Sequence, residues 1–216
     1  LEFRRVLFRS SGKSTIANII PRFFEIQSGE ISINGQDIKK IPQKELRDKI
    51  GFVPQKAFLF SGTIEENIRY GKEDASIEEV KHAASIAQAD EFISDMEDKY
   101  DSFVAQGGNN LSGGQKQRIS IARALVRKPE VYVFDDSFSA LDFKTDKRLR
   151  KALKNEIKDS SAIIIAQRIS TIMDANQIIV LNDGKIVGIG KHKDLLENCE
   201  VYKQIADSQL SKEELA

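Results

Sequence analysis

The second half of the chain alternates between segments patterned as helices and short apolar runs patterned as strands. The pattern predicts two helices, over residues 113–128 and 145–158, and four strands, over residues 130–135, 162–166, 177–181 and 185–190. Strands that alternate with helices of this length form a mainly parallel sheet. The Asp183-Gly184 pair between the last two strands predicts a tight turn, and therefore one antiparallel pair.

The first half of the chain contains a stretch of helices with no strand between them. A helix is predicted over residues 13–24, a strand over 30–33 closed by Asn34-Gly35, and a strand over 51–53. Three predicted helices then follow one another, over residues 63–70, 76–87 and 90–96. A chain of 216 residues is short for two full domains, because typical domains have about 150 residues. We therefore expect an α/β core with a helical subdomain inserted over about residues 56–128.

Charge and hydropathy exclude several classes of protein. Lys+Arg and Asp+Glu number 33 each, so the chain lacks the overall cationic field that attracts nucleic acid or anionic membranes. We therefore expect no nucleic-acid partner. Apolar runs such as Ala162–Ala166 fall far short of the ~18 residues that predict a membrane-spanning helix. The single cysteine, Cys199, permits no internal disulfide and suits a reducing cytoplasm.

The first ten residues, LEFRRVLFRS, differ in character from the rest of the chain. They carry three arginines and show no helix cap, no clear period and no signal-peptide pattern. We expect residues 1–10 to be a non-native extension that forms no strand with one apolar face. The alternative is an unusual native terminus.

Residues 10–15, with the sequence SSGKST, supply the second half of a phosphate-binding loop. In such a loop, backbone N–H groups at a helix N-terminus surround phosphate oxygens and a lysine adds a positive charge. The full pattern G-x-x-x-x-G-K-[ST] requires glycine at position 7, where this chain has Leu7, and the short tail also occurs by chance. The candidate nucleotide-binding residues are Ser11, Gly12, Lys13, Ser14 and Thr15.

A buried-strand pattern over residues 131–134 ends in two carboxylates, Asp135 and Asp136. Parallel strands end at one edge of a sheet, where ligands of such folds bind. Beside a phosphate loop, Asp135 is expected to hold Mg²⁺ and Asp136 to orient or deprotonate an attacking water. The alternative is a strand followed by an aspartate that caps a helix.

A second glycine-rich helix start has the sequence LSGGQ. It predicts another anion-binding helix end, although a flexible loop capped by its serine is the alternative. Together with the phosphate-loop tail and the paired aspartates, this segment resembles the signature of the ATP-binding cassette family, formed by Leu111, Ser112, Gly113, Gly114 and Gln115. The resemblance covers residues 11–216 and implies a P-loop NTPase (RecA-like) core that lacks its N-terminal part. That core combines a mainly parallel sheet, antiparallel β elements and an inserted helical subdomain.

The resemblance also assigns roles to residues elsewhere in the chain. Gln55 resembles the glutamine of the family's Q-loop, Ser139 and Asp142 resemble its D-loop, and Gln167 stands where the family usually has its switch histidine. The implied cofactors are ATP and Mg²⁺. The implied metal ligands are Ser14, Gln55 and Asp135, and the implied catalytic residues are Asp136, Gln167 and Gln55.

Residues 58–64 (FLFSGTI), followed by Glu66-Asn67-Ile68, resemble the exporter type of this family. That type implies a transmembrane domain on the same polypeptide, a place on the cytoplasmic face of a bacterial membrane, and efflux of drugs, lipids or peptides. Residues 104–108 (VAQGG) resemble the segment that contacts the transmembrane coupling helices, and an ordinary glycine-rich loop is the alternative. A cytosolic family member acting in DNA repair or translation would carry coiled-coil insertions or basic arms, and the sequence shows neither.

Two positions depart from the family's hydrolytic pattern, which has glutamate after the magnesium aspartate and histidine at the switch. This chain has Asp136 and Gln167. A carboxylate withdrawn by one methylene, about 1.5 Å, is misplaced enough to cost on the order of 10²-fold in rate. Glutamine can donate a hydrogen bond but cannot become cationic. The resemblance to one half of heterodimeric bacterial multidrug exporters implies a slow site here, with LSGGQ completing the active site of a partner half-transporter; the alternative is a non-hydrolysing, nucleotide-gated clamp.

Overall fold

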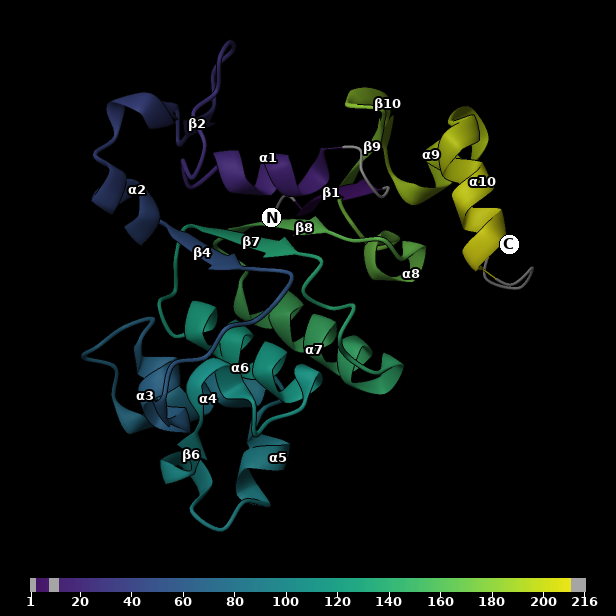
Figure 1. The fold of residues 1–216 in the computed structure, drawn as a ribbon. Helices are drawn as coiled ribbons and strands as arrows, with labels where there is room; N and C mark the ends of the chain where they lie inside the picture. The colour runs from purple at the N-terminus through teal and green to yellow at the C-terminus, as the bar shows by residue number, and fades with distance from the viewer. Residues whose placement is uncertain (1–2, 8–11, 211–216) are drawn as a thin grey trace. The chain divides into compact units, whose positions relative to one another are not determined.

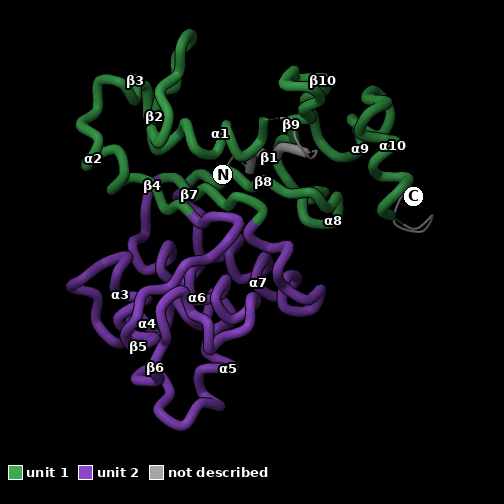
Figure 2. The backbone as a smooth tube through the Cα atoms, viewed as in Figure 1, with its two compact units in different colours: residues 1–52, 131–136, 161–216 green, residues 53–130, 137–160 purple. Residues whose placement is uncertain are grey.

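The computed structural model describes residues 3–7 and 12–210, with side chains from residue 12 onward. The chain divides into two compact units, coloured green and purple in Figure 2. Unit 1 comprises residues 1–52, 131–136 and 161–216, and unit 2 comprises residues 53–130 and 137–160. The chain therefore leaves and re-enters unit 1 at the ends of its strands.

Unit 1 is built on a six-stranded sheet in the order β10-β9-β1-β8-β7-β4 (Figure 1). The strands are β1 (Phe3–Leu7), β4 (Ile50–Val53), β7 (Val131–Asp135), β8 (Ser161–Ile165), β9 (Gln177–Asn182) and β10 (Lys185–Gly190). Strand β1 pairs in parallel with β8 and β9, β7 pairs in parallel with β8, and β10 is antiparallel to β9. The predicted α/β fold with a mainly parallel sheet and an antiparallel last pair is confirmed.

Strand β1 corrects one prediction. Residues 1–10 were expected to form no strand with one apolar face, yet Phe3–Leu7 is a strand that lies between β8 and β9. A strand with a neighbour on each side has backbone partners on both edges, so its pairing outweighs the lack of a clean apolar face in its sequence. Residues 1–2 and 8–10 lie outside the described residues.

The helices of unit 1 are short. They are α1 (Lys13–Ile19), α2 (Gln43–Asp48), α8 (Ile169–Ile172), α9 (His192–Asn198) and α10 (Glu200–Gln209), with a 3-10 turn at Ile38–Lys40. Helix α1 packs on β7 and β8, where Ala17 and Ile20 share one hydrophobic cluster with Val133 and Ile165. The helix predicted over 13–24 ends early because Pro21 has no N–H to continue the helical hydrogen bonds and Arg22 has a φ of 54°, although Ile20 keeps helical angles.

A small hairpin, β2 (Ser32–Ile33) with β3 (Gln36–Asp37), follows α1. Asn34 and Gly35 close it with φ angles of 51° and 78°. Two positive φ angles in a two-residue hairpin loop favour this Asn-Gly pair, because asparagine and glycine tolerate left-handed backbone best. The turn predicted here is confirmed.

Unit 2 is mainly helical. Its elements are β5 (Gly62–Thr63), α3 (Ile64–Arg69), α4 (Ile77–Ile86), α5 (Asp90–Ser94), β6 (Phe103–Val104), α6 (Gly113–Leu125) and α7 (Phe143–Glu156), with 3-10 turns at Lys99–Asp101 and Gln106–Gly108. Helices α3 and α4 begin at capping boxes on Thr63 and Ser76, and both pack against α6. The three helices predicted in succession are present. Across residues 3–7 and 12–210, no helix is long and apolar enough to span a bilayer.

Candidate functional site

The start of α1 meets the end of β7 in unit 1. Ser14 Oγ donates a hydrogen bond of 3.1 Å to Asp135 Oδ1, across 121 positions of sequence. The preceding Lys13 is 6% exposed, as is Asp135. Gly12 caps the helix with a φ of 89°, a conformation that favours glycine, and a Cβ added there would meet no atom within 4 Å. The structure thus brings together Lys13, Ser14 and Asp135 beside an open helix start.

Burial and charge act in opposite directions on these groups. Burial lowers the pKa of the Lys13 ammonium, while the charges of Asp136 and Asp135 work to raise it. Burial likewise raises the pKa of the Asp135 carboxyl, against the hydrogen bond from Ser14 and the charge of Lys13. Desolvation is the larger effect for both residues. Further positive charge near Asp135 would favour its ionised form, and a polyanion near Lys13 would favour its protonated form.

The second carboxylate, Asp136, meets Gln167 because of the register of two strands. Asp135 in β7 pairs with Ile165 in β8, so the residues that follow both strands leave the same edge of the sheet. Asp136 turns there with a φ of 47°, and its N–H donates to the Ile165 carbonyl at 2.9 Å. Gln167 Nε2 donates to Asp136 Oδ2 at 2.8 Å. Asp136 and Gln167 are therefore in direct contact.

The phosphate-loop and Q-loop predictions name three further residues. Ser11 is outside the described residues, and Thr15 is exposed on α1. Gln55 is exposed in unit 2, two residues after β4. The backbone before it is held by two residues that sequence reasoning missed. Gln117 Nε2 donates to the Pro54 carbonyl at 3.0 Å, and Ser137 Oγ donates to the Val53 carbonyl at 2.9 Å.

The signature segment forms the first turn of α6 in unit 2. Ser112 and Gln115 make a capping box: Gln115 N donates to Ser112 Oγ at 3.2 Å, and Ser112 N donates to Gln115 Oε1 at 2.8 Å. Ser112 and Gly113 are exposed, whereas Leu111 is buried. A Cβ at Gly113 would meet nothing within 4 Å, whereas one at Gly114 would lie 3.3 Å from the Ala140 carbonyl oxygen. The exposed face of this helix start is Ser112 and Gly113.

The predicted D-loop residues also lie in unit 2. Ser139 is exposed. Asp142 caps α7, because its Oδ1 accepts the Thr145 N–H at 2.9 Å. The side-chain and backbone hydrogen bonds of Thr145 lower the pKa of the Asp142 carboxyl, so this cap is charged at neutral pH. Asp142 therefore has a structural role whatever else it does.

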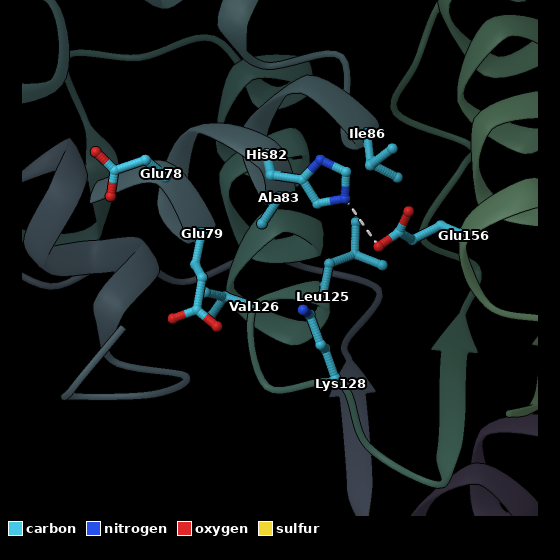
Figure 3. A pocket seen from close by; sticks show the side chains of 9 residues that line it. All are labelled: Glu78, Glu79, His82, Ala83, Ile86, Leu125, Val126, Lys128 and Glu156. Carbon is cyan, nitrogen blue, oxygen red and sulfur yellow. Dashed lines mark hydrogen bonds and ion pairs between the residues drawn. The ribbon is translucent and has the colours of Figure 1, made fainter. Parts of the chain in front are cut away.

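A cavity of about 230 Å³ opens on α4 in unit 2 (Figure 3). His82 Nε2 lies 2.9 Å from Glu156 Oε1 in its lining, which also includes Ile86 and Leu125. Glu79 on the same wall is paired with Lys72 at 2.8 Å. None of the candidate site residues lines this cavity. We therefore assign this cavity no part in the site.

Comparisons with known proteins agree with this geometry. Residues 10–139 match the family described as ABC transporter. The chain is 48% identical over 203 residues to the uncharacterized ABC transporter ATP-binding protein YfiB of Bacillus subtilis, covering 94% of this chain and 35% of that protein. It is 42% identical to ABC transporter B family member 4 of Dictyostelium discoideum, covering 94% of this chain and 26% of that one.

Solved structures show the same likeness. A bacterial Atm1-family ABC exporter with ATP bound superposes with a TM-score of 0.93 at 39% identity, covering 98% of this chain and 37% of that one. The chain spans about a third of the length of YfiB and of this exporter.

Proposed function

Because the chain belongs to the ABC transporter family, we propose that it is the ATP-binding and ATP-hydrolysing domain of an ABC exporter. The observation that carries the proposal is the hydrogen bond between Ser14 and Asp135. It joins the tail of the phosphate-loop motif to the strand that ends in two carboxylates, and Lys13 is buried beside it. A phosphate-binding lysine, a hydroxyl and a carboxylate in one cluster suit a magnesium nucleotide.

The residues present fit Mg²⁺. The Ser14 hydroxyl and the Asp135 carboxylate already lie within 3.1 Å of each other, and both are hard oxygen donors of the kind that this ion prefers. When bound, Mg²⁺ neutralises phosphate charge and favours the ionised form of the raised Asp135 carboxyl. Lys13 adds a positive charge for the phosphates. The proposal that Gln55 is a further ligand rests on the resemblance of the sequence alone.

We propose that hydrolysis at this site is slow. Asp136 is one methylene shorter than glutamate, and one of its carboxylate oxygens accepts the hydrogen bond from Gln167. The same amide cannot take up a proton as charge develops on the transferring phosphate. The group that would orient water is therefore shorter than glutamate, and the group that would stabilise the phosphate cannot become cationic as histidine can.

The signature is proposed to act on a second molecule. The exposed Ser112 hydroxyl and Gly113 N–H lie at the start of α6, which has 13 residues. A helix start of this kind favours anions. We propose that it closes over ATP held by a partner half-transporter, which makes the assembly an asymmetric heterodimer.

A surface of unit 2 supports a transmembrane-domain partner. Phe58, Phe60 and Tyr70 are 52%, 39% and 64% exposed, and the Phe60 and Tyr70 rings stack with centroids 4.4 Å apart. The Arg123 guanidinium lies over the Phe60 and Tyr70 rings, and it donates to the Phe58 carbonyl at 3.0 Å. Burial lowers the pKa of Arg123 to about 10, so this side chain stays charged at neutral pH. Gly107, in the segment expected to contact the coupling helices, donates to the Leu59 carbonyl at 2.9 Å.

Clustered exposed aromatic side chains are typical of protein interfaces. We propose that this patch docks the transmembrane domain of the exporter, which places the chain on the cytoplasmic face of the membrane.

A non-hydrolysing, nucleotide-gated clamp is the second candidate function, and the hydrogen bond between Gln167 and Asp136 favours it. The two functions differ in phosphate release. We would measure single-turnover release from the chain alone, with a family partner that has the catalytic glutamate, and with that partner after its glutamate is removed.

A slow ATPase still releases some phosphate in the third mixture, and Lys13→Ala abolishes this residual release. A clamp binds ATP in all three mixtures but releases phosphate only when the partner's glutamate is present. If the chain binds ATP in none of the three mixtures, both functions are contradicted.

A further inference from the structure

We propose that Gln209, at the end of α10, is a positioning residue for the switch position Gln167. The inference rests on the proposed function, because it concerns how the same site is held in its working geometry. It assigns a role in nucleotide turnover to a side chain 42 positions away in the sequence.

The Gln209 amide bridges the backbone on both sides of Arg168. Its Nε2 donates to the Gln167 carbonyl oxygen at 2.9 Å, and its Oε1 accepts the Ile169 N–H at 2.8 Å. The Gln167 side chain in turn donates to Asp136 at 2.8 Å. A continuous series of hydrogen bonds therefore runs from α10 through the switch loop to the carboxylate, all within unit 1.

The geometry requires an amide. Ile169 is the first residue of α8, so its N–H has no partner within that helix, and the Gln167 carbonyl precedes the helix. One group must accept from the first and donate to the second. Among uncharged side chains of this length, only glutamine offers both a carbonyl oxygen and an NH₂ group.

Helix α10, which carries Gln209, is held in place by packing. It packs on α8 and β9 and buries Tyr202 and Ala206 completely, one to two turns before Gln209. The Gln167 carbonyl cannot move away from α10 without losing its hydrogen bond. Since misplacement of a catalytic group by ~1 Å costs on the order of 10²-fold in rate, restraint at the backbone of Gln167 bears directly on turnover.

A purely structural role is the competing explanation, because Gln209 also caps α8. The two explanations differ in how substitutions at 209 and 167 combine. If Gln209 acts through Gln167, its removal matters only while the Gln167 side chain is present, and the two effects are not additive. A cap that only stabilises α8 produces the same loss in either background.

The experiment measures kcat and KM for ATP in the whole chain at high concentration, where its own signature can complete the site of a second copy. The variants are Gln209→Ala, Gln209→Glu, Gln167→Ala and the double variant Gln167→Ala/Gln209→Ala. Gln204→Ala is the matched control, because Gln204 lies on the same helix and its Nε2 donates to Glu200 Oε1 at 3.1 Å. Gln209→Glu keeps an acceptor for Ile169 N–H but loses the donor to Gln167.

We expect Gln209→Ala and Gln209→Glu to lower kcat by about tenfold with KM unchanged, and Gln204→Ala to change neither. In the Gln167→Ala background, Gln209→Ala should lower kcat no further. Amide exchange at Ile169 should become faster in Gln209→Ala, which confirms that the bridge has been lost in a folded chain.

Equal kcat in the parent and Gln209→Ala overturns the inference, and so does the same loss in both backgrounds. A parent chain that binds ATP without hydrolysing it overturns the inference alone, and a parent that does not bind ATP overturns the proposed function as well. The parent thus separates the two failures.

Discussion

The side-chain amide of Gln167 donates a hydrogen bond of 2.8 Å to the carboxylate of Asp136. The two residues follow neighbouring parallel strands at matched register, Asp135 beside Ile165. Two groups that are expected to act on water and on phosphate therefore restrain each other. Their chemistry can be changed without altering the sheet that positions them.

Restoring both groups should speed hydrolysis at the site that contains Lys13. Asp136→Glu returns the missing methylene, and Gln167→His supplies a group that can become cationic. We expect the double variant to hydrolyse ATP about 10²-fold faster than the parent. Each single variant should gain less, because it still lacks either the longer carboxylate or the group that can become cationic. The measurement is single-turnover hydrolysis with the catalytic carboxylate of the partner removed. If the double variant is as slow as the parent, these two side chains do not limit the site.

Replacing Asp135 by asparagine should separate stability from metal binding. Burial raises the pKa of this carboxyl, so the folded state holds its proton more tightly than the unfolded state does. Its contribution to stability is greatest at low pH and is lost as pH rises through the raised pKa. At neutral pH without metal, Asp135→Asn should therefore unfold at the same or a higher temperature, since Asn Oδ1 can still accept from Ser14.

Thermal unfolding in chelator at several pH values checks this prediction. The difference in unfolding temperature between Asp135→Asn and the parent should become smaller at acid pH. MgATP should raise the unfolding temperature of the parent but not that of the variant. A variant that MgATP stabilises as well as the parent shows that Asp135 is not a metal ligand.

The sequence predicted much of unit 1 because its strands are apolar runs that end in chemically distinctive residues. The resemblance to the family implied Ser14 and Asp135 as ligands of one metal, and Ser14 Oγ lies 3.1 Å from Asp135 Oδ1. Strand β1 was missed because Arg4 and Arg5 spoil its apolar pattern, although backbone pairing on both edges defines it. Helix α2 was missed because six residues are too few to show a helical period.

The residues that support the site could not be predicted from the sequence. Gln117 reaches Pro54 across 63 positions, and Gln209 reaches Gln167 across 42. Glutamine is common on helix surfaces, so its type and spacing carry no signal of a distant backbone partner. The contact between Asp136 and Gln167 depends in the same way on strand register, which a single sequence does not specify.

Gly113→Asp should block hydrolysis by the assembled dimer without disturbing the fold. The position has open space, and aspartate in the first turn of a helix is favourable, so thermal stability should stay the same. The new carboxylate would oppose phosphate in a closed interface. Gly113→Ala, which adds bulk without charge, is the matched control and should lose less activity. Unchanged phosphate release in Gly113→Asp contradicts a role for this helix start in trans.

Glycines at positions 7 and 10 should strengthen ATP binding. The family's loop has glycine where this chain has Leu7 and Ser10, and missing side chains let backbone N–H groups approach phosphates. We expect Leu7→Gly/Ser10→Gly to lower the Kd for ATP, measured by calorimetry. Ser28→Gly, at an exposed loop position of unit 1, controls for added backbone freedom. Equal affinity before and after the change would mean that residues 1–10 do not weaken the loop.

The central claim is that the cluster of Lys13, Ser14 and Asp135 binds MgATP, and its most direct test is the Kd of the whole chain for MgATP. Lys13→Ala removes the buried ammonium, and Lys40→Ala removes an exposed one elsewhere in unit 1. A hydrogen bond to a charged group is worth about 1.5–3 kcal/mol, so Lys13→Ala should raise Kd by at least about tenfold. Lys40→Ala should bind as the parent does. Equal Kd values for Lys13→Ala and the parent, or no binding by the parent, would contradict the claim.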